Sequence, residues 1–301
     1  MCSSSVASSH LNDDGLEAFE LAPWDVDVDT DDDWAATASR ALVTNGFCVL
    51  RGKLVPEELC ERCSGAALSR LSSLLERVRA RGLDPDRGDS SRFTELCQRM
   101  HSKRFDVRLP PLHRATHARS VAGLEEDERE TWAELQVAAD RWAWPVLRAS
   151  MLLSHEESGI DGRIDSAGAV VALPGAAAQE FHADGSMAGL VNCFIALVPT
   201  TPHNGPTEFQ PGSHDPVEFA FSPPPWQDEE QTRPVAPCLA RGEILLFQYR
   251  VKHRGCANAS AVPRPLGYLV YAQHGVQDDY NFPSDSSLFD EHESSVQSSP
   301  G

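Results

Sequence analysis

Residues 190–198 read Leu-Val-Asn-Cys-Phe-Ile-Ala-Leu-Val, an almost wholly apolar run of the length of one buried strand. Similar short apolar or alternating runs lie on both sides of it, divided by Gly, Pro, Asn and Ser: residues 167–173, 178–182, 207–210, 235–239, 244–249 and 267–272. Their order shows no regular alternation of strands with helices. Many short strands separated by turn residues are typical of an antiparallel sandwich or jelly roll, so residues 165–275 predict such a core.

Residues 34–155 predict mainly helices. A short helix is expected over residues 34–44, followed by an Asn-Gly turn and a compact strand at 47–50. Pro56, Glu57 and Glu58 then open a long helix, because proline and acids suit a helix N-terminus. A further helix is predicted by apolar residues at steps of three and four, with a proline expected to kink or end it: Trp132, Leu135, Ala139, Trp142, Pro145 and Val146. The predicted class is therefore α+β, with N-terminal helices packed against the core.

The charge of the chain is unevenly distributed. The 301 residues carry a formal net charge of −19, yet residues 1–33 and 265–301 contain no Lys or Arg at all. We therefore predict an acidic disordered tail at 1–33, a folded and nearly neutral domain at 34–275, and an acidic Ser-rich tail at 276–301. This acidity excludes a generally basic protein that binds nucleic acid or anionic membranes.

The sequence gives no sign of export or membrane insertion. No apolar run reaches the roughly 18 residues of a spanning helix, and the N-terminus lacks a basic segment followed by an apolar stretch. A cytoplasmic protein without a membrane partner is the expectation. Its oligomeric state is left open.

The residues with the clearest chemistry are Gln179-Glu180-Phe181-His182-Ala183-Asp184-Gly185. In a strand, alternate side chains share a face, so His182 and Asp184 would present an imidazole and a carboxylate together. His253 lies far downstream and supplies a possible third ligand. Two histidines and one carboxylate leave open positions on a metal, which suits Fe(II) and oxygen chemistry better than zinc.

Arg264 follows His253 by eleven residues and leads into the last apolar run. A guanidinium there could pair with the carboxylate of a small co-substrate. The alternative for this residue is a surface or structural arginine.

Several segments together resemble the phytanoyl-CoA dioxygenase-like family of Fe(II)- and 2-oxoglutarate-dependent oxygenases. Gln179-x-x-His182-x-Asp184 is similar to that family's Q-x-x-H-x-D segment, and Asn204-Gly205-Pro206 with Pro211-Gly212-Ser213-His214 resembles its N-G-P and P-G-S-H loop. The resemblance also covers Asn45–Gly52, Gly242–Phe247 and His253–Gly255, and it extends over roughly residues 40–275. It implies a double-stranded β-helix, the cupin-like form of the jelly roll.

The resemblance also implies roles. His182, Asp184 and His253 would bind Fe(II), and Arg264 would hold the distal carboxylate of 2-oxoglutarate. Asn192, Phe194 and Gln179 would line the co-substrate pocket, although core packing explains Phe194 equally well. The expected reaction uses O2, decarboxylates 2-oxoglutarate to succinate and hydroxylates a small-molecule substrate.

Because Asp184 retains the metal carboxylate, hydroxylation or another oxidation is expected rather than halogenation. Some relatives have Ser two residues after the distal histidine where this chain has Gly255.

The substrate and two competing functions stay open at this point. Residues 99–119 hold six Lys or Arg and one acid, Asp106, which predicts either pairing with the acidic run 125–130 or a binding edge for an anionic substrate. The alternatives to an oxygenase are a non-catalytic jelly-roll protein that binds a metal or ligand, and a cupin-type metalloenzyme that does not use 2-oxoglutarate. The intact trio of His182, Asp184 and His253 together with Arg264 argues against the first, and Arg264 with the loop at 204–214 discriminates against the second.

Overall fold

The computed structural model describes residues 9–11, 17–19, 22–87, 92–99, 103–109, 124–150, 152, 163–214, 233–278, 281 and 286–290. The helices are α1 (Trp34–Asn45), α2 (Glu57–Ala80), the 3₁₀ turn η1 (Pro85–Arg87) and α3 (Glu126–Ser150). The strands are β1 (Ser9–Leu11), β2 (Glu17–Phe19), β3 (Asp25–Asp27), β4 (Phe47–Arg51), β5 (Leu96–Gln98), β6 (Arg104–Leu109), β7 (Arg163–Ala172), β8 (Leu190–Ala196), β9 (Thr207–Phe209), β10 (Ile244–Gln248), β11 (His253–Gly255) and β12 (Arg264–Ala272).

Two sheets of unequal size form the core, and β1 pairs with β2 apart from them. The large sheet has eight strands in the order β3-β4-β10-β8-β12-β7-β6-β5, antiparallel except for the β3–β4 pair. The small sheet pairs β11 with β9, and single bridges extend it on both sides, His182 with His253 and Phe209 with Val235. The runs 178–182 and 235–239, expected to be strands, therefore contribute one bridge each.

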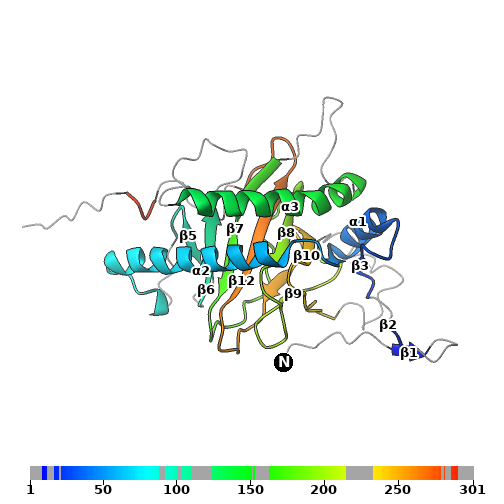
Figure 1. Ribbon diagram of the computed structural model, residues 1–301, viewed down its shortest axis with the longest axis horizontal. Coiled ribbons are helices and arrows are strands. Elements are labelled where there is room, and N and C mark those ends of the chain that lie inside the picture. The colour runs from blue at the N-terminus through cyan, green and yellow to red at the C-terminus, as the bar shows by residue number, and fades with distance from the viewer. Residues whose placement is uncertain are drawn as a thin grey trace, which may run out of the picture.

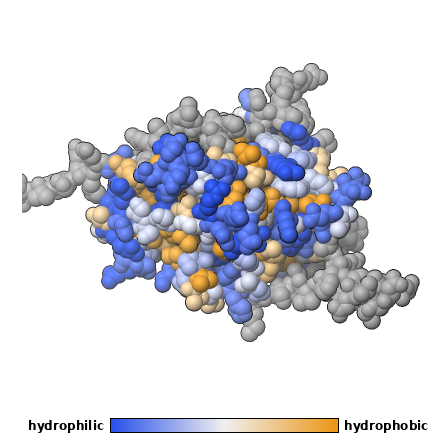
Figure 2. Space-filling view, viewed as in Figure 1, coloured by the Kyte–Doolittle hydropathy of each residue, from blue (hydrophilic) through white to orange (hydrophobic). Residues whose placement is uncertain are grey.

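Helices α2 and α3 lie across one face of the large sheet (Figure 1). Their apolar positions and the inward residues of the strands form the main hydrophobic core, which includes Leu74, Trp132, Leu135, Val171 and Ile195. The outer surface of this helical layer is mostly hydrophilic, with apolar residues scattered singly (Figure 2). This arrangement confirms the predicted α+β class with helices packed against the β core.

Two local expectations need correction. Pro145 lies inside α3, which continues to Ser150, so this proline does not end the helix. The segment 34–155 is not only helical with one strand, because β5 and β6 join the large sheet beside β7. Among the described residues, no helix is long and apolar enough to cross a membrane.

The prediction of a disordered N-terminal tail is wrong for residues 22–33, which belong to the folded body. Strand β3 pairs in parallel with β4, and Val26 is buried in the main core. Asp25 and Glu243 both form ion pairs with Arg51, at 2.7 and 2.6 Å. The acidic composition concealed this strand because one of its carboxylates neutralises a partly buried arginine. Most of the remaining tail lies outside the described residues.

The predicted C-terminal tail is also wrong for the residues that the structure describes there. Leu288 is 3% exposed and belongs to the main core. Its backbone N–H and the Ser287 hydroxyl both donate to the buried carboxylate of Glu95. Phe289 packs beneath Arg77, with 4.1 Å between the guanidinium carbon and the ring centre. This segment therefore closes the folded body at the end of α2.

Replacing Leu288 by Ala is expected to lower the free energy of unfolding by about 2 kcal/mol, because a buried leucine side chain is lost from the core. Denaturant titration measures this change. Val262→Ala serves as the control, since Val262 is 59% exposed and should change stability by less than about 0.5 kcal/mol. Equal stability of the Leu288 variant and the wild type would show that the segment contributes nothing to the core.

Candidate metal centre and ligand cavity

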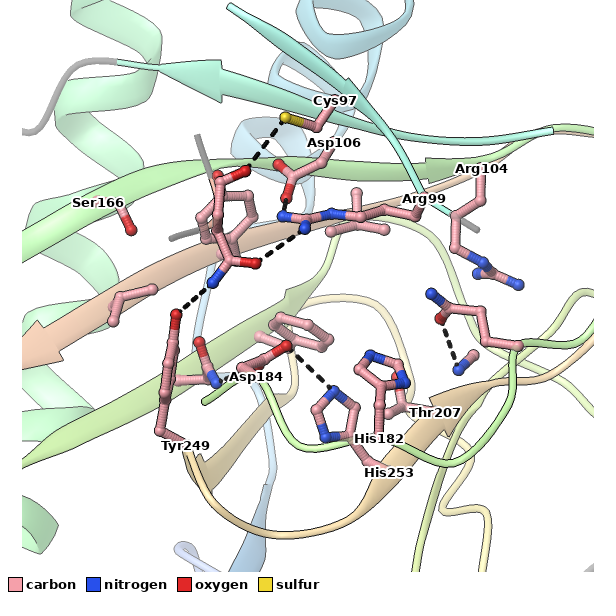
Figure 3. A pocket seen from close by; sticks show the side chains of 18 of the residues that line it. Cys97, Arg99, Arg104, Asp106, Ser166, His182, Asp184, Thr207, Tyr249 and His253 are labelled. Carbon is pink, nitrogen blue, oxygen red and sulfur yellow. Dashed lines mark hydrogen bonds and ion pairs between the residues drawn. The ribbon is translucent and has the colours of Figure 1, made fainter. Parts of the chain in front are cut away.

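His182, Asp184 and His253 converge between the two sheets. Each offers one ligand atom, and these three atoms lie within 4.8 Å of one another. The backbone explains how residues so far apart in sequence meet. The His182 N–H donates to the His253 carbonyl at 3.0 Å, and the His253 N–H donates to the His182 carbonyl at 2.8 Å. The predicted trio is thus brought together by the edge of the small sheet (Figure 3).

Backbone carbonyls orient both imidazole rings. Nδ1 of His182 lies 2.9 Å from the Glu180 carbonyl, and Nδ1 of His253 lies 3.0 Å from the Val251 carbonyl. Since a carbonyl only accepts, each Nδ1 carries the proton and each Nε2 keeps a free lone pair. Burial, and then the neighbouring His253, lowers the pKa of His182 below its ordinary value. Both effects favour a neutral His182 ring that is ready to bind a metal ion.

Asn192 orients the carboxylate of Asp184. Its side-chain amide on β8 donates to Oδ2 of Asp184 at 2.9 Å, while Oδ1 lies 3.7 Å from Nε2 of His253. One carboxylate oxygen is therefore held by the protein and the other faces the histidines. The sequence had indicated Asn192 as a residue of the co-substrate pocket. It does line the cavity, and its hydrogen bond to Asp184 positions a candidate metal ligand.

Replacing Asn192 by Ala should weaken Fe(II) binding by about 10- to 100-fold, the usual cost of losing such an outer partner. An anaerobic titration of the metal-free protein with Fe(II) would measure it. Asn204→Ala provides a control for the loss of a buried amide, because among the described residues the Asn204 side chain bonds within its own loop, to Thr201 and Pro199. An unchanged Fe(II) affinity in the Asn192 variant would show that Asn192 does not position Asp184 for metal binding.

A cavity of about 420 Å³ opens beside the three residues. It lies between the sheets, and alternate residues of the large sheet line it because they share one face. These lining residues are Arg104, Asp106, Ser166, Val170, Asn192, Phe194, Arg264, Tyr268 and Val270. The volume suits a small molecule.

Arg264 lies at the start of β12, lines this cavity and is 1% exposed. Its Nη2 donates to the Gly205 carbonyl at 2.7 Å, whereas Nε and Nη1 are buried without a hydrogen-bond partner among the described residues. Burial, and then the charge of Arg104, lowers its pKa well below the usual range. A guanidinium with unused donors in a cavity is a site for an anion. The residues present therefore fit a carboxylate co-substrate.

The loop at 204–206 supports Arg264. Gly205 has φ of +83°, and a Cβ there would lie 2.5 Å from the Cys256 carbonyl oxygen. Only glycine fits this close approach, which leaves the Gly205 carbonyl facing Arg264. At the far end of the loop, Nε2 of His214 bonds to the Val43 carbonyl at 2.9 Å. His214 thus ties its loop to α1.

Gln179 and Phe194 both line the cavity, as the sequence predicted. Oε1 of Gln179 accepts a hydrogen bond from the Gly255 N–H at 2.9 Å, so this side chain joins the two segments of the small sheet. Phe194 packs edge-on against Phe247 with 4.8 Å between ring centres. Their contact with a co-substrate stays a prediction.

Arg104 is one of several cavity residues that sequence reasoning missed. Arg104 was included in the basic stretch 99–119, yet it lines the cavity and is 1% exposed. The strict alternation Arg104-Phe105-Asp106-Val107-Arg108-Leu109 was the available signal. It predicts a strand with its charged residues on one face.

A polar network borders the cavity on the side away from the small sheet. Arg99 pairs with Asp106 at 2.5 Å and donates to Oδ1 of Asn281 at 2.9 Å. Asn281 also donates to the hydroxyl oxygen of Tyr249, which donates to Asp278. Arg99 therefore pairs with Asp106, the one acid of the basic stretch 99–119, and with Asn281 near the C-terminus. His101, His113, Arg114, His117 and Arg119 of the stretch lie outside the described residues.

Solved structures share this fold. AviO1 from Streptomyces viridochromogenes Tue57 is 20% identical, with a TM-score of 0.50 over 81% of this chain and 97% of that chain. EctD from S. alaskensis, solved with 2-oxoglutarate and 5-hydroxyectoine, is 19% identical, with a TM-score of 0.50 over 81% and 78%. The epimerase SnoN, in complex with Fe3+, α-ketoglutarate and nogalamycin RO, is 15% identical, with a TM-score of 0.50 over 88% and 92%.

A sequence model of the family described as phytanoyl-CoA dioxygenase matches residues 42–266. This range runs from the end of α1 to the start of β12, and it includes every residue singled out above for iron and 2-oxoglutarate. The family resemblance and the jelly-roll core expected from the sequence are both confirmed. The chain belongs to the phytanoyl-CoA dioxygenase family of iron- and 2-oxoglutarate-dependent enzymes.

Proposed function

We propose that this protein is a hydroxylase that inserts one oxygen atom of O2 into a small polar molecule and converts 2-oxoglutarate to succinate. The observation that carries the proposal is the pairing of two elements in one cavity. One is the trio His182, Asp184 and His253, with both Nε2 atoms free of backbone partners. The other is the buried Arg264, whose Nε and Nη1 have no hydrogen-bond partner within the described part of the chain.

Each residue has a distinct task in this reaction. His182, Asp184 and His253 would hold Fe(II), which supplies oxygen activation coupled to the decarboxylation of 2-oxoglutarate. Arg264 would bind the distal carboxylate of the co-substrate and fix its orientation in the cavity. Asn192 keeps the Asp184 carboxylate in one orientation through its 2.9 Å hydrogen bond. His253 is buried, whereas His182 and Asp184 are half-buried.

The substrate would occupy the part of the cavity bordered by Arg99, Asp106 and Tyr249. These groups engage one another and Asn281 in hydrogen bonds and an ion pair, so a polar molecule matches them better than an apolar one. The charge of the preferred substrate depends on which of these groups are left without a partner when the substrate binds. The two competing functions lose support because family membership and an unsatisfied Arg264 both favour use of 2-oxoglutarate.

The proposal is tested by supplying Fe(II), 2-oxoglutarate and O2 with a panel of small polar molecules. A true substrate should stimulate succinate release, and its product should be heavier by one oxygen atom that derives from labelled O2. Succinate release with a product that gains no oxygen would reject hydroxylation in favour of an epimerisation or ring closure. If wild-type protein formed no succinate with any candidate, the proposal would lose its support.

A further inference from the structure

Two arginines occupy the same row of the large sheet. Arg104 on β6 and Arg264 on β12 are both register partners of Ala172 on β7, the strand between them. Register partners point to the same face of a sheet, and neighbouring strands are about 4.8 Å apart. Two long cationic side chains therefore project from the same row into the same end of the cavity, with Ala172 at the register position between them.

Both guanidinium groups are buried and incompletely bonded. Each arginine is 1% exposed. Arg104 donates through Nη2 to the Cys256 carbonyl at 2.7 Å, and its Nε has no partner among the described residues. In the part of the chain that the structure describes, neither arginine forms an ion pair with a carboxylate. An uncompensated pair of buried like charges is costly, so this end of the cavity is built for a negative charge that the protein itself does not supply.

The electrostatics of the pair agree with that conclusion. Burial lowers the pKa of Arg104 to about 10. The pKa of Arg264 is lowered further, by burial and by the positive charge of Arg104. A bound anion between them would offset both effects at once.

Gly255 makes room for Arg104. A Cβ at this position would lie 2.6 Å from both the Cζ and the Nη1 of Arg104, and 2.9 Å from Oε1 of Gln179. The guanidinium thus fills the space that any side chain at position 255 would need. Figure 3 shows Arg104 extending from its strand toward the part of the cavity near His182. Since Gly255 lies two residues after His253, the guanidinium is placed beside the candidate metal centre.

We propose that Arg104 is a second binding residue for 2-oxoglutarate and that it clamps the distal carboxylate together with Arg264. The inference rests on the proposed use of 2-oxoglutarate and adds a residue to that site. A carboxylate has two oxygens with several lone pairs, which can accept from guanidinium groups on both sides. The glycine at 255 is then required because the second cation occupies the space above it.

The test measures binding rather than turnover. Protein loaded with Mn(II) is titrated by calorimetry with 2-oxoglutarate and, separately, with pyruvate, a 2-oxo acid that lacks the distal carboxylate. Arg104→Met should weaken 2-oxoglutarate binding by about 30-fold or more, as expected for loss of one charged partner in a buried site, and leave pyruvate binding nearly unchanged. Arg104→Lys should recover part of the affinity because it restores the charge without the planar fork.

The control is Arg108→Met, which removes the same residue type from the same strand at a position that does not line the cavity. It should bind both acids as the wild type does. Weakening of both acids by Arg104→Met to the same extent, or no weakening of either, would overturn the proposal. If wild-type protein failed to bind 2-oxoglutarate at all, the proposed function itself would fail, which is a distinguishable result.

A double-mutant cycle gives a second, independent test. Gly255→Ala displaces the guanidinium and should weaken 2-oxoglutarate binding when Arg104 is present. In the Arg104→Met background the same change should have little further effect, because the group it displaces is gone. Equal effects of Gly255→Ala in both backgrounds would show that the glycine does not act through Arg104 and would contradict the clamp.

Discussion

Replacing Asp184 by Ala is expected to abolish stable Fe(II) binding and succinate formation. Asp184 is the one carboxylate in the trio, and the two histidines that remain are neutral ligands. The loss should therefore exceed the roughly 10- to 100-fold effect of removing an outer partner such as Asn192. Iron content after anaerobic loading and desalting, together with a succinate assay, measures both consequences on one sample.

Glu208→Gln is the matched control for Asp184→Ala. Glu208 lies on β9 next to β11, but its carboxylate bonds to Arg254 rather than to the metal centre. This variant should keep the wild-type iron content. An Asp184 variant that retained iron and turnover at wild-type levels would refute the assignment of the three ligands.

Replacing Arg264 by Met is expected to lower the affinity for 2-oxoglutarate by roughly 100-fold or more, the range measured when one partner of a buried charge pair is truncated. The free energy of unfolding, measured without co-substrate, should not fall in parallel with the affinity. Arg264 is fully buried, two of its nitrogens lack hydrogen-bond partners among the described residues and its pKa is lowered, so an apolar side chain of similar length removes an unfavourable burial. We expect the free energy of unfolding to stay level or to rise.

This pair of responses separates a binding arginine from a structural one. Denaturant unfolding without ligand gives the stability, and calorimetry with the Mn(II)-loaded protein gives the affinity. A structural arginine would show the opposite pattern, with a large loss of stability and no selective loss of 2-oxoglutarate relative to pyruvate. Such a result would assign Arg264 to the fold and not to the co-substrate.

The part of the candidate site that a local sequence pattern could predict is the pair His182 and Asp184. The period of two in a strand placed His182 and Asp184 on one face, and the structure brings these side chains together. The distance along the chain to His253 carried no such information. The reciprocal backbone hydrogen bonds between positions 182 and 253 join the two segments, and pairing between distant segments is set by the whole sheet.

Arg104 shows why part of the site could not be predicted. Its alternating sequence predicts a strand face, but no local pattern says that β6 adds to the edge of β7 in register with Arg264 across Ala172. Residues 99–119 were treated as one basic stretch in the sequence, and this average charge concealed that Arg104 is buried. Composition failed in the same way at the termini, where Val26 and Leu288 belong to the core within acidic segments.

Anaerobic addition of Fe(II) and then 2-oxoglutarate, followed by visible absorption, tests most directly whether this chain assembles an iron–2-oxoglutarate centre. Wild-type protein should develop a metal-to-ligand charge-transfer band only when both components are present, and admission of O2 should then yield succinate. His182→Ala should show neither response. Absence of the band in the wild type, or an equal band in His182→Ala, would contradict the assignment of this cavity as the site of the reaction.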